Sequence, residues 1–293
     1  MSLQPKTAFV LSGGASLGAV QVGMLMALRD HGARPDLVFG ASAGAVNAAW
    51  VAGDPTLTDL DHLAGLWRGL RSRDVFPVRP VLGFLGFVGR RNSLVPADGL
   101  RRIVTANVRY ARLEDARIPI GLVATEVRTG QEVVLDRGPV VDAVLASSAI
   151  PGVFPPVTVG DHLLIDGGVV NNTPISHAVD AGAERIYVLP TGYACSPERP
   201  PRGALALTMH AVSLMVEQRL IDDLARFQHE VDLRVIPPLC PLKVLPTDFS
   251  QAADLIDRSH AAAARWLERI DVRGVPDDQR RFVGFHEHPP AAA

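Results

Sequence analysis

A serine stands in the pentapeptide Gly40-Ala41-Ser42-Ala43-Gly44, between an apolar run typical of a strand and a small-residue run typical of a helix. In this context a GxSxG sequence forms a tight turn that pushes the serine oxygen out of the fold, and its small neighbours permit the strained backbone. The helix that follows points its positive N-terminal end at the serine. The pattern favours Ser42 as a nucleophile over a serine that simply begins a helix.

A glycine-rich loop, SGGASLG at residues 12–18, joins the first expected strand to the first expected helix. Backbone N–H groups in such a loop can bind an anion, with help from the helix dipole. The loop is not GxGxxG and lacks the Gly-Lys-Ser/Thr ending of a P-loop, which disfavours a phosphate site. Beside a nucleophilic serine, we expect this loop, which ends at Gly18, to form an oxyanion hole.

An aspartate ends a short apolar run and is followed by two glycines, as Asp166-Gly167-Gly168. The glycines let the chain turn sharply and leave the carboxylate uncrowded. Taken alone, this sequence is only a turn. Ser147 and Ser148, in the small-residue segment before it, lack the turn of a nucleophile and are poor candidates for that role.

Histidine and cysteine indicate no clear site. A Ser-Asp-His order could run through His177 or His210, but nothing around either histidine marks a general base. Cys195 and Cys240 are far apart and belong to no CxxC or Cys/His cluster, so we expect no disulfide scaffold and no zinc site. No motif for another metal or for a cofactor is found, and we expect neither.

Together these segments resemble the patatin-like phospholipase family. LSGGASLG is similar to its glycine-rich loop, GASAG to its nucleophile turn and DGG to its aspartate motif, with further similarity in SSAIPGVFPPV and DGGVVNNTPI. The similarity runs from about Ala8 to Val188, in the family's order and spacing. It implies a hydrolase that cleaves acyl esters of phospholipids or other long-chain lipids through an acyl-enzyme. Ser42 would be the nucleophile and Asp166 the base, without a histidine. Gly13, Gly14 and Ala15 would form the oxyanion hole.

Two positions depart from the family pattern. Ala15 stands where the family usually has a third glycine, and Leu17 where it usually has Arg or Lys. An alanine at positive φ would be strained, and the lost cation could weaken electrostatic support or shift substrate preference. An active hydrolase remains our expectation. The alternatives are a catalytically weak lipid-binding or regulatory protein and an acyltransferase, although we find no His and Arg motif of the kind that acyltransferases need.

The spacing of apolar residues predicts the elements that must position these motifs. Strands are expected at 7–12, 37–39, 118–127, 132–135, 157–159, 162–165, 185–189 and 233–236, and helices at 18–30, 43–52, 57–70, 97–108, 139–147, 175–181, 204–229 and 250–270. Thr173 is the expected N-cap of the helix at 175–181. The alternation predicts a three-layer α/β/α fold with a mostly parallel central sheet. We expect one domain at 1–273 and a polar, proline-rich tail at 274–293.

Residues 72–96 are rich in proline, glycine and arginine and are expected to form a long loop. Between residues 68 and 112 there are ten arginines and two aspartates. Near the middle, Phe84 and Phe87 lie in a run of apolar residues that Arg90 and Arg91 follow. An apolar tip between arginines suits contact with anionic lipid, and a loop folded over the core or a lid on the site fits equally well.

Composition and charge exclude other classes. The chain has 293 residues, 47% hydrophobic and 20% charged, as in an ordinary globular protein rather than a disordered or coiled-coil one. Its net charge of −2 argues against general nucleic-acid binding. No signal-peptide pattern and no membrane-spanning apolar run is found. We therefore expect a cytoplasmic protein that can contact the membrane surface, with a lipid or acyl ester as its substrate.

Overall fold

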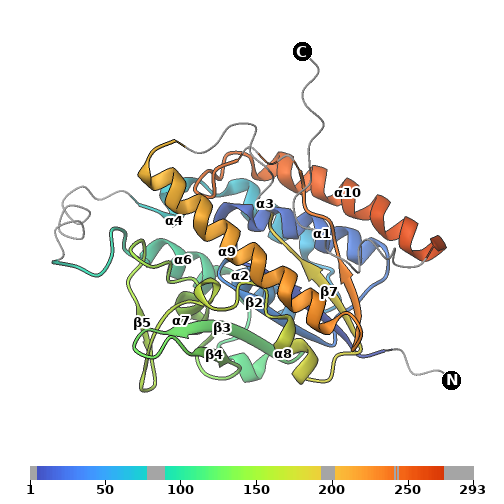
Figure 1. The fold of residues 1–293 in the computed structure, drawn as a ribbon, viewed down its shortest axis with the longest axis horizontal. Coiled ribbons are helices and arrows are strands. Elements are labelled where there is room, and N and C mark those ends of the chain that lie inside the picture. The colour runs from blue at the N-terminus through green and yellow to red at the C-terminus, as the bar shows by residue number, and fades with distance from the viewer. Residues whose placement is uncertain (1–4, 78–89, 193–201, 241, 243, 274–293) are drawn as a thin grey trace, which may run out of the picture.

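The computed structural model describes residues 5–77, 90–192, 202–240, 242 and 244–273. Within them, an eight-stranded sheet has the order β5-β6-β3-β2-β1-β7-β8, with β4 also paired to β3 (Figure 1). The parallel strands are β1 (Thr7–Leu11), β2 (Leu37–Ala41), β3 (Ile120–Glu126), β7 (Arg185–Leu189) and β8 (Asp232–Val235). The strands added antiparallel are β4 (Glu132–Leu135), β5 (Val157–Val159) and β6 (His162–Asp166).

Helices cover both faces of this sheet, as the alternation of elements predicted. The α-helices are α1 (Gly18–Asp30), α2 (Ala43–Gly53), α3 (Leu60–Gly69), α4 (Ser72–Val75), α6 (Asp98–Asn107), α7 (Val140–Ser147), α8 (Ile175–Asp180), α9 (Ala204–Phe227) and α10 (Ala252–Arg273). The short 3-10 helices in the described part of the chain are η1 (Ala15–Leu17), η2 (Leu113–Asp115) and η3 (Gly167–Val169). The three-layer α/β/α arrangement is confirmed.

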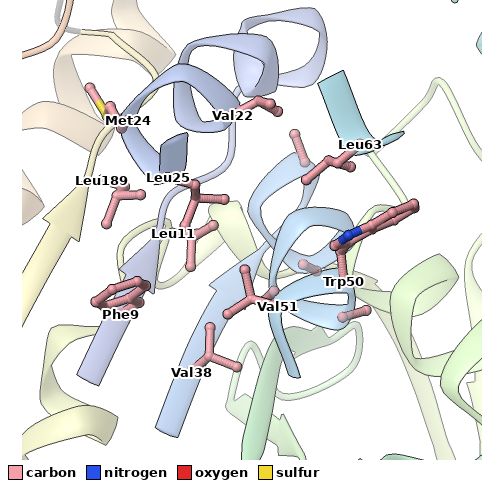
Figure 2. Packing of buried hydrophobic residues seen from close by; sticks show 14 of the residues in the cluster. Phe9, Leu11, Val22, Met24, Leu25, Val38, Trp50, Val51, Leu63 and Leu189 are labelled. Atoms are coloured by element: carbon pink, nitrogen blue, oxygen red, sulfur yellow. The ribbon is translucent and has the colours of Figure 1, made fainter. Parts of the chain in front are cut away.

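The core divides into two clusters because successive strand residues point to opposite faces. Phe9 and Leu11 of β1 share one buried cluster with residues of α1, α2, α3 and α10, and Figure 2 shows Leu11 beside Leu25 of α1. The alternate residues of β1, Ala8 and Val10, pack with α8 and α9 on the other face of the sheet. A fully buried valine, leucine or phenylalanine side chain stabilises the fold by about 1.5–3 kcal/mol. The two clusters therefore pack on both faces of the central strands and fix the positions of the strand ends, where the glycine-rich loop and the Ser42 turn begin.

The register of β3 brings two motifs together. Ala124 pairs with β4 on one edge and with Asp166 of β6 on the other. The preceding residue, Val123, pairs with β4 and with Ala41, the last residue of β2. Consequently β2 and β6 both pair with the same edge of β3. They run in opposite directions, so that their C-terminal ends meet. Ser42, directly after β2, therefore meets Asp166, although 124 positions separate them in the sequence.

Most expected elements are confirmed within one to three residues, and the strand pairs β3–β4 and β5–β6 form antiparallel hairpins. Three expectations were wrong. Part of the expected loop at 72–96 is the helix α4. The N-cap of α8 is Pro174 rather than Thr173. Cys240 is disulfide-bonded, although the sequence led us to expect no disulfide scaffold; Cys195 lies outside the described residues.

The described helices include none with both the length and the apolar character needed to cross a bilayer.

Candidate active site

Ser42 occupies a strained turn at the start of α2. Its backbone has φ 54° and ψ −122°, a region that costs a non-glycine residue roughly 1–3 kcal/mol and that persists only when its surroundings hold it. Close packing explains the flanking glycines. A Cβ on Gly40 would lie 2.5 Å from the Gly44 carbonyl oxygen, and one on Gly44 would lie 2.2 Å from that of Leu11. The GxSxG sequence thus forms the predicted strand-turn-helix.

The C-terminal end of α7 holds this turn in place. Ser147 accepts a hydrogen bond from the Ser42 amide through both its carbonyl oxygen and its Oγ, each at 3.1 Å. Its hydroxyl also donates to the Val123 carbonyl at 2.6 Å. Ser148 Oγ donates to the Ser42 carbonyl at 3.0 Å. The two serines that were rejected as nucleophiles therefore act on the backbone of Ser42, a role their sequence alone did not reveal.

The same segment positions Asp166, because the next residue, Ala149, accepts the Asp166 amide at 3.0 Å. The Asp166 carboxylate is buried and accepts a 2.7 Å hydrogen bond from the Gly168 amide. Burial raises the pKa of this carboxyl from 3.8 to about 6, while hydrogen bonds from the Ser42 side chain and the Gly168 amide oppose the rise. The carboxylate is thus both a partner of Ser42 and a stronger base than an exposed aspartate.

Steric crowding also explains the two glycines after Asp166. A Cβ on Gly167 would lie 2.1 Å from the Val123 carbonyl oxygen. A Cβ on Gly168 would lie 2.7 Å from Asn172 Oδ1 and 3.0 Å from the carboxylate itself. The turn is therefore tight, and side chains at these two positions would displace the acid.

The glycine-rich loop lies directly beside Ser42, since a Cβ on Gly13 would lie 2.9 Å from Ser42 Cβ. The Gly13 amide is already engaged, because it donates to the Asn172 carbonyl at 3.1 Å. The amides of Gly14 and Ala15 have no acceptor among the described residues. Ala15 has φ 50°, so the expected strain of an alanine at this position is present. The loop therefore offers two unused N–H groups, from Gly14 and Ala15.

A chain of buried side chains supports this loop from below. Gln21 Nε2 donates to the Ser12 carbonyl at 2.8 Å, and Asn47 Nδ2 donates to Gln21 Oε1 at 2.9 Å. Trp67 Nε1 completes the chain by donating to Asn47 Oδ1 at 3.0 Å. The Trp67 ring also explains Gly18, where a Cβ would lie 2.6 Å from it. Because unpaired buried polar groups are costly, this network fixes α1, α2 and α3 relative to the loop.

An apolar cavity that is open to solvent adjoins Ser42. Its wall includes Trp67, Phe76, Phe154 and Phe249, whose rings stack or tilt against one another at centroid distances of 5.3–6.1 Å. The remaining lining residues are Ala15, Ala43, Val46, Leu66, Leu70, Val75, Leu100, Ile103, Ser148 and Ile150. A cavity of this composition suits a hydrocarbon chain and offers few polar contacts.

The other side of the loop borders a second, more polar cavity, lined by Gly13, Gly14, Leu17, Asn172 and Thr191 among others. Leu17, where a cation was expected from the family pattern, therefore contributes an apolar surface next to the loop.

The predicted lipid-contact loop is only partly described. Phe84 and Phe87 lie outside the described residues. Arg90 and Arg91 are exposed. In the segment after them, the amides of Leu94 and Val95 donate to the carbonyl oxygens of residues 152 and 153 at 3.0 and 2.9 Å.

Two of the histidines have partners away from Ser42. His177 hydrogen-bonds Glu132 at 2.6 Å and stacks on Phe39, and His260 hydrogen-bonds Asp30 at 2.9 Å. Among the described residues, no group of three or more His, Cys, Asp or Glu side chains could hold a metal ion.

Comparison with known proteins places this site in a family. The sequence profile of the patatin-like phospholipase family matches residues 9–179, which include the glycine-rich loop, Ser42 and Asp166. This chain belongs to the patatin-like phospholipase family. It is 32% identical over 200 residues to an NTE family protein of Mycobacterium tuberculosis, covering 68% of this chain and 52% of that one. It is 28% identical over 187 residues to human patatin-like phospholipase domain-containing protein 6, covering 63% and 13%.

The chain thus spans about half the length, or less, of these curated relatives. Among solved structures, human GIVD cytosolic phospholipase A2 aligns with a TM-score of 0.48 and 13% identity, over 95% of this chain and 60% of that one. VipD from Legionella pneumophila aligns with a TM-score of 0.47 and 14% identity, over 97% and 72%. Similarities this distant do not bear on the site.

Proposed function

We propose that this protein is a serine lipid acyl hydrolase that uses Ser42 and Asp166 as a dyad. The observation that carries the proposal is the buried Asp166 carboxylate, which hydrogen-bonds Ser42 and has a pKa raised to about 6. A carboxylate with this pKa is largely ionised at neutral pH, yet accepts a proton more readily than an ordinary aspartate. The adjoining apolar cavity argues for a long-chain acyl ester as substrate.

In the first half-reaction, Ser42 Oγ attacks the ester carbonyl carbon while its proton passes to Asp166. The carbonyl oxygen becomes an oxyanion, and the unused amides of Gly14 and Ala15 are the donors that we assign to it. Collapse of the tetrahedral intermediate breaks the bond to the alcohol, which leaves with the proton held by Asp166. Because Gly13 donates its amide to Asn172, Gly13 shapes the hole without donating to it.

In the second half-reaction, Asp166 removes a proton from water, and the resulting hydroxide attacks the acyl-enzyme carbonyl. The same amides stabilise the second oxyanion, and Asp166 returns its proton to Ser42 Oγ as the fatty acid leaves. Transfer of the acyl group to another alcohol would follow the same path, with that alcohol replacing water.

Two alternatives remain open to experiment: a weakly catalytic lipid-binding protein, which Ala15 and Leu17 would favour, and an acyltransferase. Hydrolysis of p-nitrophenyl esters of short and long chains tests the proposal, together with labelling by a fluorophosphonate probe. We expect Ser42→Ala to abolish both, and Ser72→Ala, a change at an exposed serine, to preserve both. Labelling and turnover that persist in Ser42→Ala would refute the dyad. Wild-type protein that is inactive on all chain lengths would favour the lipid-binding alternative.

We further propose that the protein contacts lipid surfaces from the cavity side. The helix α6 contributes Leu100 and Ile103 to the cavity wall and exposes Arg101 and Arg102 to solvent. The helices α4 and α6 and the segment that begins at Arg90 lie at one end of the molecule (Figure 1). Exposed arginines on a helix that lines an apolar cavity would meet anionic headgroups while an acyl chain enters.

A further inference from the structure

The peptide group between Gly13 and Gly14 is held firmly from one side. Thr191 Oγ1 donates a 2.6 Å hydrogen bond to the Gly13 carbonyl oxygen, and Asn172 Nδ2 approaches the same oxygen at 3.4 Å. A trans peptide group is planar, with its C=O and N–H pointing in opposite directions. Holding the Gly13 carbonyl therefore sets the direction of the Gly14 amide, one of the two unused donors of the loop.

Thr191 is itself fixed by the fold. It is 5% exposed, and its own amide donates to Ser12 Oγ at 2.9 Å. It follows β7, whose last residue, Leu189, pairs with Leu11 at the end of β1. Thr191 lies two residues after the end of β7, and Gly13 lies two residues after the end of β1. The threonine therefore meets the glycine-rich loop. The contact is close, since a Cβ on Gly14 would lie 2.2 Å from Thr191 Oγ1.

We infer that Thr191 is a positioning residue for the oxyanion hole: its hydroxyl orients and polarises the Gly13–Gly14 peptide so that the Gly14 amide is presented to the reacting carbonyl. The inference rests on the proposed hydrolase function. A hydrogen bond accepted by a peptide oxygen strengthens the N–H of the same peptide as a donor, because hydrogen bonds in a chain polarise one another. Thr191 lies beyond residues 9–179, the part of the chain that the family profile matches.

The test compares Thr191→Ser and Thr191→Ala, because both lose the methyl group and only the serine keeps the donor. With a short-chain p-nitrophenyl ester, we expect Thr191→Ala to lower kcat about tenfold with little change in KM, the rate equivalent of one lost hydrogen bond. Thr191→Ser should stay within about threefold of wild type. Thr191→Val, which keeps the shape and removes the donor, should resemble Thr191→Ala. Thermal unfolding identifies any variant that does not fold, and the Ser/Ala pair then decides.

Equal kcat values for the serine and alanine variants would overturn the inference, because the hydroxyl would then have no effect on turnover. A rise in KM at unchanged kcat would also overturn it, by making Thr191 part of substrate binding. Ser42→Ala, measured in parallel, separates this failure from that of the proposed function. If Ser42→Ala is inactive while the Thr191 pair is indistinguishable, only the role of Thr191 is refuted. If Ser42→Ala retains full turnover, the hydrolase assignment falls and this inference with it.

Discussion

The raised pKa of Asp166 predicts that this residue destabilises the folded protein at neutral pH. In the unfolded chain its carboxyl ionises around the ordinary value of 3.8, whereas in the fold it ionises at about 6. Between these values, folding takes up a proton, so stability falls as pH rises. The full cost, about 3 kcal/mol, is reached above pH 6, since each unit of pKa shift corresponds to about 1.36 kcal/mol. Replacing Asp166 by asparagine, which cannot ionise, removes this dependence.

The assay is urea unfolding of wild type and Asp166→Asn at several pH values, followed by circular dichroism. The stability difference, variant minus wild type, should grow by about 1 kcal/mol between pH 5 and pH 7.5, from the same two pKa values. The change with pH is the decisive quantity, because the altered hydrogen bonds to Ser42 and Gly168 contribute a nearly constant offset. Esterase turnover in Asp166→Asn should fall on the order of 10²-fold or more, as the base is lost.

A stability difference that stays constant over this range would refute the raised pKa, and a difference that shrinks with rising pH would reverse its sign. A variant that is stabilised in the expected way but keeps full esterase turnover would show that the buried carboxyl is not the base. Single alanine changes of the histidines serve as the control for turnover. One as damaging as Asp166→Asn would indicate a triad in place of the dyad.

The value of kcat/KM for a soluble ester should fall about tenfold between pH 8 and pH 5, because about a tenth of a carboxyl with pKa near 6 is ionised at pH 5; a flat profile would contradict an Asp166 base. Gly14→Val should lower kcat by about 10²–10³, the effect of losing one oxyanion donor, and a rise in KM instead would indicate a binding turn. Arg90→Gln combined with Arg91→Gln should weaken binding to anionic vesicles and slow hydrolysis of lipid in them, with a soluble short-chain ester unaffected.

The control for the arginine variant is the same loss of charge at Arg34 and Arg137, which are exposed in other parts of the chain. If the control pair weakens vesicle binding equally, net charge rather than a lipid-contact surface explains the effect. Equal loss on vesicles and on the soluble ester would mean that the substitutions disturb the cavity itself.

The sequence alone was sufficient for the features that depend on nearby residues. Apolar periodicity predicted nearly every strand and helix, because periods of about two and 3.6 residues are local properties of the backbone. The turn at Ser42 was predictable as well, since GxSxG between a strand and a helix permits few backbone paths. The family motifs around Ser42 and Asp166 indicated which residues to examine. They did not specify the distance, burial or protonation of either side chain.

Tertiary structure decided everything that depends on residues far apart in the chain. β2 and β6 meet end to end only because both pair with the same edge of β3, and no local pattern encodes that register. The raised pKa of Asp166 follows from burial by the whole fold, so it cannot be read from neighbouring residues. Likewise, only the packed structure shows that Asn172 engages the Gly13 amide and that Thr191 supports the loop. Hydrogen bonds to backbone atoms depend on position rather than on residue type, and the sequence carries little signal for them.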